Sequence, residues 1–310
     1  MSMLLFDEAA VRRLLPMSTA IDLLETAFAG LAAGEALNQP RRRLFASTGT
    51  VLHSMAGAVG PYIGTKVYST NPKHGAWFLF WLLDAATGRP LAIFEANYLG
   101  QIRTGAASGL ATRRLARSKA SKVGIIGSGF QARSQMEAMM AVRKVDEVRV
   151  WSRDRAKCEA FSAAFPMARI AGSADEAVAG ADIVITATGA KDSLFDAAAL
   201  SPGTHINVMG SNSPARREVS AETLARAGRI VADSVEACRI EAGDLLLGLD
   251  EAGWGRVEEL CTAPARANEH EITLFKSVGM GLEDVAVAGY IYEQGKASGD
   301  FQSVAMFDRS

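Results

Sequence analysis

Small residues at fixed spacing mark one segment near the middle of the chain. Gly127, Gly129 and Ala132 form the pattern G-x-G-x-x-A, directly after an apolar run typical of a strand and directly before a helical pattern. In that context the first glycine permits a tight turn, the second lets a pyrophosphate approach the backbone, and the alanine lets helix and strand pack closely. The helix N-terminus adds unpaired N–H donors. The pattern predicts dinucleotide binding, and the alternative is a glycine turn that binds nothing.

The residues after the next predicted strand bear on the choice of dinucleotide. Sites for NAD present a carboxylate there to the ribose 2′-hydroxyl, but this chain has Ser152 and Arg153, with no carboxylate before Asp154. A hydroxyl followed by a guanidinium suits a 2′-phosphate, which arginine holds by charge-assisted hydrogen bonds. We therefore predict a preference for NADPH, with NADH as the alternative cofactor. Arg153 could also be a solvated loop charge.

The scaffold that must position these residues follows from the apolar segments. Short apolar strands alternate with helices, and we predict strands at residues 122–126, 147–151, 169–171, 182–187, 205–209 and 229–232. Strands separated by helices of this length form parallel sheets with crossover connections. The predicted fold class is therefore α/β, with a Rossmann-type doubly wound sheet in a domain at residues 114–280. Thr188 and Gly189 then lie on the carboxyl edge of that sheet, unless they form an ordinary turn.

The first third of the chain has a different pattern. A helical pattern covers residues 18–34, and β-formers and aromatics dominate residues 62–69 and 76–83 before an apolar run at 91–94. We predict an antiparallel sheet there, then a helix at 104–117, and a last helix at 282–296 that returns to this part of the chain. Residues 1–113 with about 281–310 thus form a smaller α+β domain for substrate binding and dimerisation, because its sheet edges and apolar faces favour a homodimer.

Composition excludes several classes of function. The 310 residues include 33 Lys and Arg against 34 Asp and Glu, with 49% hydrophobic residues, as in soluble globular proteins, and a bulk nucleic-acid-binding surface is disfavoured. Three cysteines without a C-x-x-C pair favour a reducing compartment and disfavour a structural metal site. The longest apolar run, residues 76–83, is too short to cross a membrane, and Asp7 precedes any basic residue. We expect a cytoplasmic protein with no metal, nucleic-acid or membrane partner.

Four further segments complete a wider pattern. They are residues 39–42 (Gln-Pro-Arg-Arg), 64–67 (Gly-Thr-Lys-Val), 103–108 (Arg-Thr-Gly-Ala-Ala-Ser) and 275–284 (Phe-Lys-Ser-Val-Gly-Met-Gly-Leu-Glu-Asp). Together with the glycine motif they resemble the ornithine cyclodeaminase/mu-crystallin family over nearly the full length of the chain. That family includes cyclodeaminases, alanine dehydrogenases and reductases of cyclic or open imines, as well as mu-crystallin, a ketimine reductase that binds thyroid hormone.

The resemblance implies a clamp for a substrate carboxylate. The matching cations here are Arg42, Lys66 and Arg103, although Arg41 and Arg43 flank Arg42 and leave the choice within that triplet open. Lys66 shares its predicted strand face with a glycine and two tyrosines, which is an unusual setting for a solvated lysine. Three cations without a nearby run of acids favour an anion site, whereas each of them alone would be explained as a surface charge or an ion pair.

The resemblance also bears on proton transfer. The family's lyases carry a carboxylate in the loop after the strand at 205–209, where this chain has Asn212. An amide does not take a proton as a carboxylate does, so cyclodeamination is disfavoured, although Asn212 can still orient an imine or serve its own turn. His53 falls where the cyclodeaminases place a glutamate. Its ordinary pKa near ~6.5 suits proton delivery, and a core histidine is the alternative.

The cofactor site also gains members from the resemblance, since Ser277 and Gly279 match the family's turn beside the nicotinamide. The complete predicted cofactor-binding set is Thr104, Gly127, Ser128, Gly129, Phe130, Gln131, Ala132, Ser152, Arg153, Thr188, Gly189, Gly210, Ser277 and Gly279. The predicted catalytic residues are Lys66, Asn212 and His53.

These elements predict an NADP-dependent oxidoreductase that reduces a C=N bond beside a carboxylate. Arg42 and Arg103 would hold the carboxylate, and Lys66 would donate the proton or stabilise the reacting centre. From the family resemblance and Asn212, the expected substrate is a cyclic α-imino acid, Δ1-pyrroline-2-carboxylate or Δ1-piperideine-2-carboxylate. The alternatives are an ornithine cyclodeaminase, an amino-acid dehydrogenase, or an NADPH-dependent ligand-binding protein like mu-crystallin. The sequence does not distinguish the ring size of the substrate or the physiological direction.

Overall fold

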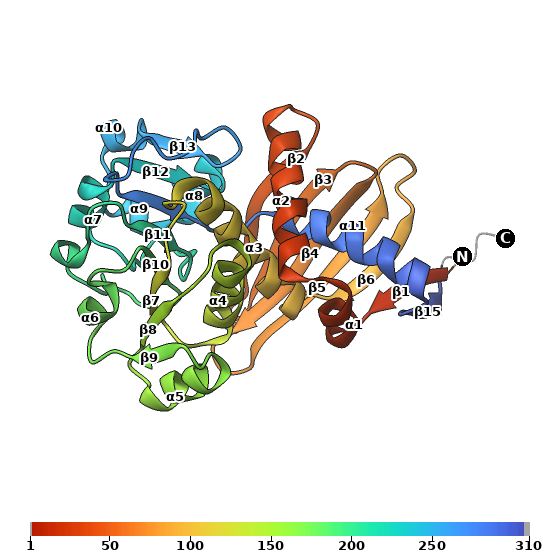
Figure 1. The fold of residues 1–310 in the computed structure, drawn as a ribbon. Coiled ribbons are helices and arrows are strands. Elements are labelled where there is room, and N and C mark those ends of the chain that lie inside the picture. The colour runs from red at the N-terminus through yellow and green to blue at the C-terminus, as the bar shows by residue number, and fades with distance from the viewer. Residues whose placement is uncertain (1, 307–310) are drawn as a thin grey trace. The chain divides into compact units, whose positions relative to one another are not determined.

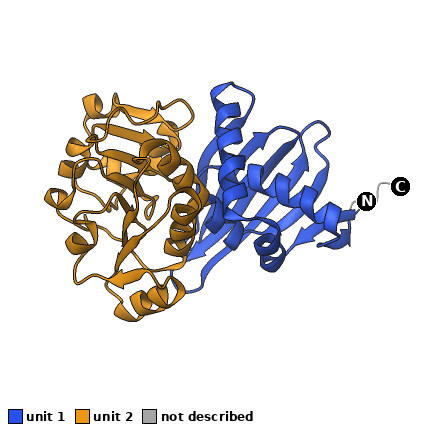
Figure 2. Cartoon of the chain, in the orientation of Figure 1, with its two compact units in different colours: residues 1–103, 279–310 blue, residues 104–278 orange. Residues whose placement is uncertain are grey.

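The computed structural model describes residues 2–306, which divide into two compact units (Figure 2). Unit 1 comprises the residues up to 103 and from 279 onward, and unit 2 comprises residues 104–278. The first division falls after Arg103, inside helix α3 (Asn97–Leu115), and the predicted boundary at residue 113 lies later in the same helix. The later part of this helix is bonded within unit 2, because the carbonyl oxygen of Thr104 and the hydroxyl of Thr112 accept hydrogen bonds from Gln135 and Asn207. Residues 307–310 of the predicted first domain lie outside the described residues.

Unit 2 contains a parallel sheet of the predicted kind (Figure 1). Among the described residues its strands are β7 (Lys122–Ile126), β8 (Glu147–Trp151), β9 (Ala168–Ile170), β10 (Ile183–Thr186), β11 (His205–Val208), β12 (Arg229–Ala232), β13 (Val257–Glu259) and β14 (Thr273–Lys276). The spatial order is β13-β12-β14-β11-β10-β7-β8-β9, with parallel pairing throughout. The strand order reverses between β7 and β10, which is the point where doubly wound sheets bind ligands at their carboxyl ends.

The helices of unit 2 connect these strands. They are α4 (Phe130–Val142), α5 (Arg155–Ala164), α6 (Ala174–Val178), the 3₁₀ helix η1 (Ala197–Ala199), α7 (Ala221–Arg226), α8 (Val235–Glu241), α9 (Gly243–Leu246) and α10 (Glu251–Trp254). The six predicted strands correspond to β7–β12, with ends that differ by at most one residue. The α/β fold class with a Rossmann-type sheet is confirmed. The sequence analysis did not predict β13 or β14.

The central strands of unit 2 are buried on both faces, which is typical of parallel sheets and explains their continuous apolar sequence. The polar residues among them pair with one another. The His205 ring lies 2.9 Å from the Thr273 hydroxyl and 3.2 Å from the Asn207 side-chain oxygen. Burial lowers the pKa of His205 to about 3, so this histidine is neutral and serves the sheet.

Among its described residues, unit 1 contains a mixed sheet, three complete helices and the first part of α3 (Figure 1). Its described strands are β1 (Ser2–Phe6), β2 (Leu37–Phe45), β3 (Val51–Val59), β4 (Tyr62–Asn71), β5 (Gly75–Asp84), β6 (Pro90–Glu95) and β15 (Gln302–Ala305), in the order β15-β1-β6-β5-β4-β3-β2. The pairing is antiparallel as predicted, except that β1 and β6 run parallel. The helices are α1 (Glu8–Leu14), α2 (Met17–Ala32) and α11 (Gly281–Ser298).

Two further predictions from the sequence concern helices. Within residues 2–306 no single helix is long and apolar enough to span a membrane, although α1 and α2, bent by 84°, pass that test as a pair.

Helix α3 begins at Asn97 rather than at residue 104, because the Glu8 carboxylate accepts hydrogen bonds from the backbone N–H groups of Asn97 and Tyr98 at 2.8 and 2.7 Å. A cap supplied from such a distance along the chain leaves no local sequence signal.

Helix α11 returns to unit 1 as predicted and packs on β2, β3 and β4. Close approach is possible because glycines meet at the contact. A Cβ atom on Gly57 of β3 would lie 2.5 Å from the backbone nitrogen of Leu282, and one on Gly281 would lie 2.5 Å from the carbonyl oxygen of Ala56. The helix is buried nearly all round, including Glu283 and Asp284, so these two carboxylates require partners inside unit 1.

Candidate active site

The glycine motif forms the turn from β7 to α4, and its residues have different roles in the structure. Gly127 has a positive φ of 111°, and a Cβ atom there would lie 2.4 Å from the carbonyl oxygen of Ala187, so only glycine fits. Gly129 is the N-cap of α4 without any side-chain cap, and a Cβ atom there would meet nothing within 4 Å. The open space and the uncapped helix N-terminus fit a pyrophosphate.

A pocket of about 510 Å³ in unit 2 borders this turn. The loops after β7, β8 and β10 line it, and it contains six predicted residues, Gly127, Ser128, Gly129, Ser152, Arg153 and Thr188. Other predicted members do not line it, namely Phe130, Gln131, Ala132, Gly189, Gly210 and Thr104. Ala132 is fully buried, in agreement with its predicted packing task. The sequence analysis missed Lys157 of α5, which also lines the pocket.

The loop after β8 is held by its own hydrogen bonds. The Ser152 hydroxyl lies 2.8 Å from the Ser128 hydroxyl and donates to the carbonyl oxygen of Asp154 at 3.0 Å. The Asp154 carboxylate caps α5 by accepting from the Lys157 backbone N–H at 3.2 Å, and it lies 3.4 Å from the Lys157 ammonium. These contacts lower the pKa of Asp154. The acid that follows Arg153 is therefore bound to its own helix.

Ser277 and Gly279, the two residues of the turn after β14 that were predicted to bind the cofactor, contact other protein groups. The Ser277 hydroxyl donates to the Asp233 carboxylate at 3.0 Å, and the Val278 backbone N–H donates to the same oxygen at 2.8 Å. Gly279 has a positive φ of 85°, and a Cβ atom there would lie 2.5 Å from Nη1 of Arg103. Gly279 therefore leaves room for that arginine, a task that the sequence analysis did not predict.

A buried cluster of charges occupies unit 1. The Lys66 ammonium, on β4, lies 2.9 and 2.8 Å from the two carboxylate oxygens of Asp284 on α11. Arg103, on α3, donates from Nη1 to Glu283 at 2.8 Å, and its Nε lies 3.4 Å from Asp284. The four side chains are at most 8% exposed. The charge of Arg41 also acts on Lys66, and we call these five residues, Arg41, Lys66, Arg103, Glu283 and Asp284, the ion cluster.

Within the arginine triplet, the structure buries Arg41 and exposes Arg42, the residue that the resemblance matched. Arg42 is exposed on β2, whereas Arg41 is 6% exposed with its Nη2 3.3 Å from the Met55 sulfur. The pairing of β2 with β3 shifts between Gln39 and Arg42, so a bulge reverses the alternation there. Asn38 faces inward, so in a regular strand Arg42, four residues later, would also face inward.

The charge state of Lys66 follows from its surroundings. Burial lowers its pKa to about 8, Arg103 and Arg41 act in the same direction, and Asp284 opposes them through charge and hydrogen bonding. An ammonium with such a pKa gives up a proton far more readily near neutral pH than an ordinary lysine does.

The environment of His53 does not suit the predicted acid. Its ring stacks on Tyr68 with centroids 4.2 Å apart, and Nε2 lies 3.0 Å from the Thr70 hydroxyl. Burial, Arg43 and Arg41 lower the pKa of His53 to about 4. The imidazole is therefore neutral at neutral pH and lacks the proton that an acid needs. Its Nδ1 has no hydrogen-bond partner among residues 2–306, so it can serve a polar ligand.

The third predicted catalytic residue, Asn212, belongs to unit 2. It is exposed in the loop that follows β11, next to the buried Ser211. The sequence analysis missed Arg41, Glu283 and Asp284. The adjacent acids at the start of an otherwise apolar helix were the available signal, because such acids must be paired when buried.

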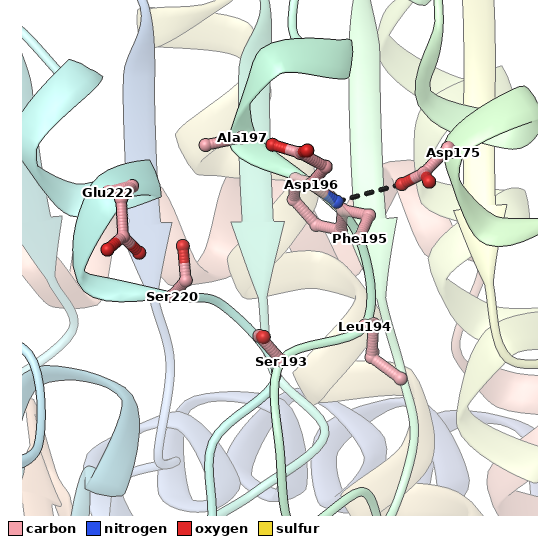
Figure 3. A pocket seen from close by; sticks show the side chains of 8 residues that line it. All are labelled: Asp175, Ser193, Leu194, Phe195, Asp196, Ala197, Ser220 and Glu222. Carbon is pink, nitrogen blue, oxygen red and sulfur yellow. Dashed lines mark hydrogen bonds between the residues drawn. The ribbon is translucent and has the colours of Figure 1, made fainter.

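A second pocket in unit 2, of about 440 Å³, is lined by acids (Figure 3). Its carboxylates support backbone turns: Asp175 accepts from the Asp196 N–H at 2.8 Å, and Asp196 caps η1 through the Ala198 N–H at 2.8 Å. Within residues 2–306 no group of three or more His, Cys, Asp or Glu could hold a metal ion. We assign this pocket no part in the site.

Comparison with known proteins agrees with the geometry. The sequence model of the ornithine cyclodeaminase/mu-crystallin family matches residues 2–299. The chain belongs to this family. A relative from Bacillus cereus, Delta(1)-pyrroline-2-carboxylate reductase, is 35% identical over 315 residues, which cover 94% of this chain and 96% of the relative.

Solved structures of the family are similar to this chain over nearly its full length. Delta(1)-pyrroline-2-carboxylate reductase from Thermococcus litoralis, in complex with NADH and L-proline, is 31% identical with a TM-score of 0.91, over 97% of this chain and 100% of that one. An archaeal alanine dehydrogenase dimer with bound NAD is 28% identical with a TM-score of 0.88, over 99% and 100%.

The glycine motif allows a matched pair of variants. Gly129→Ala fills open space at the helix N-terminus, so we expect it to weaken dinucleotide binding about tenfold or more with little change in stability. In Gly124→Ala the new Cβ would lie 2.1 Å from the carbonyl oxygen of Ala177, and this variant should lose stability. Fluorescence titration with NADPH and NADH, beside thermal unfolding, measures both effects. Unimpaired binding by Gly129→Ala would contradict the assignment.

Proposed function

We propose that the protein is a reductase of a cyclic α-imino acid, Δ1-pyrroline-2-carboxylate or Δ1-piperideine-2-carboxylate, with NADPH or NADH as the reductant. The observation that carries the proposal is the ion cluster, in which a buried lysine with a lowered pKa lies beside two buried arginines. The Bacillus cereus and Thermococcus litoralis relatives, both Delta(1)-pyrroline-2-carboxylate reductases, support it.

The charge of the cluster fits an anionic substrate. Its members are three buried cations and two buried carboxylates. A site rich in cations suits an anion, and the planar guanidinium groups of Arg41 and Arg103 match the geometry of a substrate carboxylate.

Reduction of a C=N bond needs a hydride, a proton on the nitrogen and a fixed substrate. A bound nicotinamide dinucleotide supplies the hydride. Lys66 then donates a proton from its ammonium to the imine nitrogen, while both oxygens of Asp284 hold that ammonium in place. The neutral amine that results returns to the ammonium form at neutral pH, because its pKa of about 8 still lies above that pH. His53, as a neutral imidazole, can orient the substrate by a hydrogen bond.

Asn212 favours reduction over cyclodeamination. Cyclodeamination would require a group in this loop that takes up a proton near neutral pH, and an amide cannot do so. Asn212 is exposed, so its amide is accessible to a ligand. We infer that it orients the amine or imine.

The proposed reaction is tested with a panel of cyclic and open imino acids, each with NADPH or NADH, read at the cofactor absorbance. A cyclic α-imino acid should be reduced fastest, and L-ornithine should release no ammonia. Ammonia release from ornithine at a comparable rate would favour the cyclodeaminase instead. Tight dinucleotide binding without turnover of any imino acid would favour a ligand-binding protein.

The carboxylate clamp gives a second prediction, on two neighbouring arginines. Arg41→Ala should lower kcat/KM by roughly 30-fold to several thousandfold, because the substrate carboxylate loses a partner in a desolvated site. Arg42→Ala, on the exposed side of the same strand, is the matched control and should change kcat/KM little. Steady-state kinetics with the preferred imino acid measures both, and a larger loss in Arg42→Ala would reverse the assignment.

We propose NADPH as the preferred cofactor. Arg153 and Lys157 both line the pocket, and the Asp154 carboxylate beside them is engaged in capping α5. Because Lys157 pairs with Asp154 at 3.4 Å, the preference for a 2′-phosphate rests chiefly on the guanidinium of Arg153. The Thermococcus litoralis structure with NADH and the alanine dehydrogenase with NAD support the class of cofactor, and the preference for the phosphate is inferred from this chain's own residues.

Arg153→Ala should weaken NADPH binding by about 10- to 100-fold, since a charge-assisted hydrogen bond is lost, and should alter NADH binding by less than about twofold. Arg155→Ala is the control, because Arg155 is exposed on α5 and pairs with Glu159 at 3.3 Å. Isothermal titration calorimetry with NADPH and with NADH measures these affinities. Equal affinity of the parent chain for NADPH and NADH would contradict the preference.

We further propose a homodimer in the cytoplasm. The face of the unit 1 sheet opposite α11 carries apolar side chains that are 37% to 75% exposed in the single chain, among them Leu52, Ile63, Trp77, Leu79 and Trp81. An apolar face of this kind requires a cover, and a second copy provides one. The archaeal alanine dehydrogenase structure, described as a dimer, supports this.

The dimer is tested by placing charge on that face. The double variant Trp77→Lys, Leu79→Lys should sediment as a monomer while the parent chain sediments as a dimer, because buried unpaired charges disfavour association. Met140→Lys, at a residue of α4 that is 46% exposed, is the control and should leave the assembly unchanged. Sedimentation of the parent chain as a monomer at micromolar concentration would refute the proposal.

A further inference from the structure

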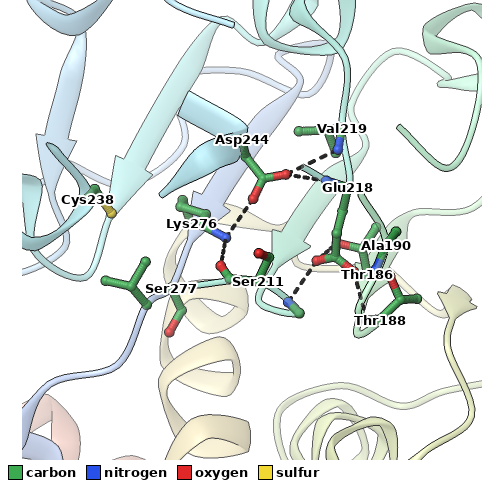
Figure 4. A network of polar contacts seen from close by, with 12 residues as sticks. Thr186, Thr188, Ala190, Ser211, Glu218, Val219, Cys238, Asp244, Lys276 and Ser277 are labelled. Carbon is green, nitrogen blue, oxygen red and sulfur yellow. Dashed lines mark hydrogen bonds and ion pairs between the residues drawn. The ribbon is translucent and has the colours of Figure 1, made fainter. Parts of the chain in front are cut away.

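Glu218 is a fully buried carboxylate of unit 2 in the segment between β11 and α7 (Figure 4). Its Oε1 accepts hydrogen bonds from the backbone N–H and the hydroxyl of Thr188, both at 2.7 Å. Its Oε2 accepts from the Thr186 hydroxyl at 2.9 Å and from the backbone N–H of Gly210 at 2.7 Å. One side chain thus joins the end of β10, the loop after β10 and the loop after β11.

The four donors favour an ionised carboxylate. Each oxygen faces one backbone N–H, which cannot turn away or become an acceptor, and a deprotonated carboxylate is the strongest acceptor on both sides. The amide of a glutamine would direct its NH₂ group at one of the two backbone donors in either orientation. The pKa of Glu218 is raised, above all by burial and also by the charge of Asp244, although Lys276 and the threonine hydroxyls oppose the shift.

A second buried pair supports Glu218 from behind (Figure 4). The Asp244 carboxylate accepts from the backbone N–H groups of Glu218 and Val219. Its other oxygen lies 2.7 Å from the ammonium of Lys276, which also donates to the carbonyl oxygen of Ser211 at 2.7 Å. The loop after β11 is therefore fixed at two adjacent residues, through its Gly210 N–H and its Ser211 carbonyl.

The network reaches the dinucleotide pocket through Thr188, which lines that pocket. Gly210 packs directly on this residue, since a Cβ atom on Gly210 would lie 2.3 Å from the nitrogen and the oxygen of Thr188 and from Oε1 of Glu218. Gly210 is thus a glycine because the two loops meet there, which differs from its predicted task of contacting the cofactor. The position of the pocket wall at Thr188 depends on Glu218.

We propose that Glu218 is a positioning residue for dinucleotide binding, which sets the loops after β10 and β11 without touching the cofactor. The proposal rests on the proposed function, because it presumes that the pocket beside Gly129 takes a dinucleotide. It implies that the binding of NADPH and the binding of NADH depend equally on Glu218. Neither Thr188 nor Gly210 lies in the loop after β8, which is the loop proposed to distinguish the two cofactors.

Glu218→Gln tests this. Its dissociation constants for NADPH and NADH should both rise about tenfold, the equivalent of one lost buried hydrogen bond, with their ratio unchanged. In the cofactor-free protein, the amide hydrogens of Thr188 and Gly210 should exchange faster. Fluorescence titration and hydrogen exchange measure these effects without turnover. Thr186→Val, which removes a single donor to Oε2, should act in the same direction, by about threefold, and serves if the glutamine variant fails to fold.

Asp182→Asn is the matched control. Asp182 accepts from the backbone N–H groups of Ser121 and Lys122 at 2.9 and 3.0 Å, at the opposite end of the same sheet, and this variant should bind both cofactors normally. Normal binding by Glu218→Gln, or an equal loss in the control, would overturn the inference alone. Failure of the parent chain to bind either dinucleotide would overturn the proposed function and the inference with it.

Discussion

Two carboxylates in the first turn of a buried helix determine the arrangement of unit 1. Glu283 and Asp284 have no exposure, and a buried carboxylate is stable only with charged or hydrogen-bonding partners. Lys66 and Arg103 supply these partners from β4 and α3, while the positive end of the α11 dipole favours acids at this position. Gly57 and Gly281 allow the helix close enough to the sheet for the ion pairs to form.

Unit 2 uses buried carboxylates in a comparable way. The Rossmann-type sheet brings the ends of β7, β10, β11 and β14 to one edge, but loops at that edge have no regular hydrogen bonds of their own. Glu218, Asp244 and Asp233 provide them by accepting from backbone N–H groups. The fold thus determines where the ligand binds, and the buried acids determine how accurately the surrounding loops are placed.

The extent to which this could be predicted depends on how local each signal is. The strands β7–β12 and the turn at Gly127 are encoded in contiguous apolar runs and a fixed glycine spacing, so the sequence was sufficient for them. The family resemblance pointed to Arg42, but the structure buries Arg41, because a bulge set by the pairing of β2 with β3 reverses the alternation. The start of α3 depends on Glu8, far away in the chain. The roles of Ser277 and Gly279 depend on Asp233 and Arg103, contacts that only the folded chain brings together.

The pH dependence of kcat/KM tests most directly whether Asp284 controls the proton on Lys66. The groups that act on this lysine are Arg103, Arg41 and Asp284, and of these only Asp284 raises its pKa. If protonated Lys66 is the donor, activity in the parent chain should fall as the pH rises through about 8. In Asp284→Asn the fall should come at lower pH, because the stabilising charge is gone. A profile whose alkaline limb stays in place in this variant would contradict the account.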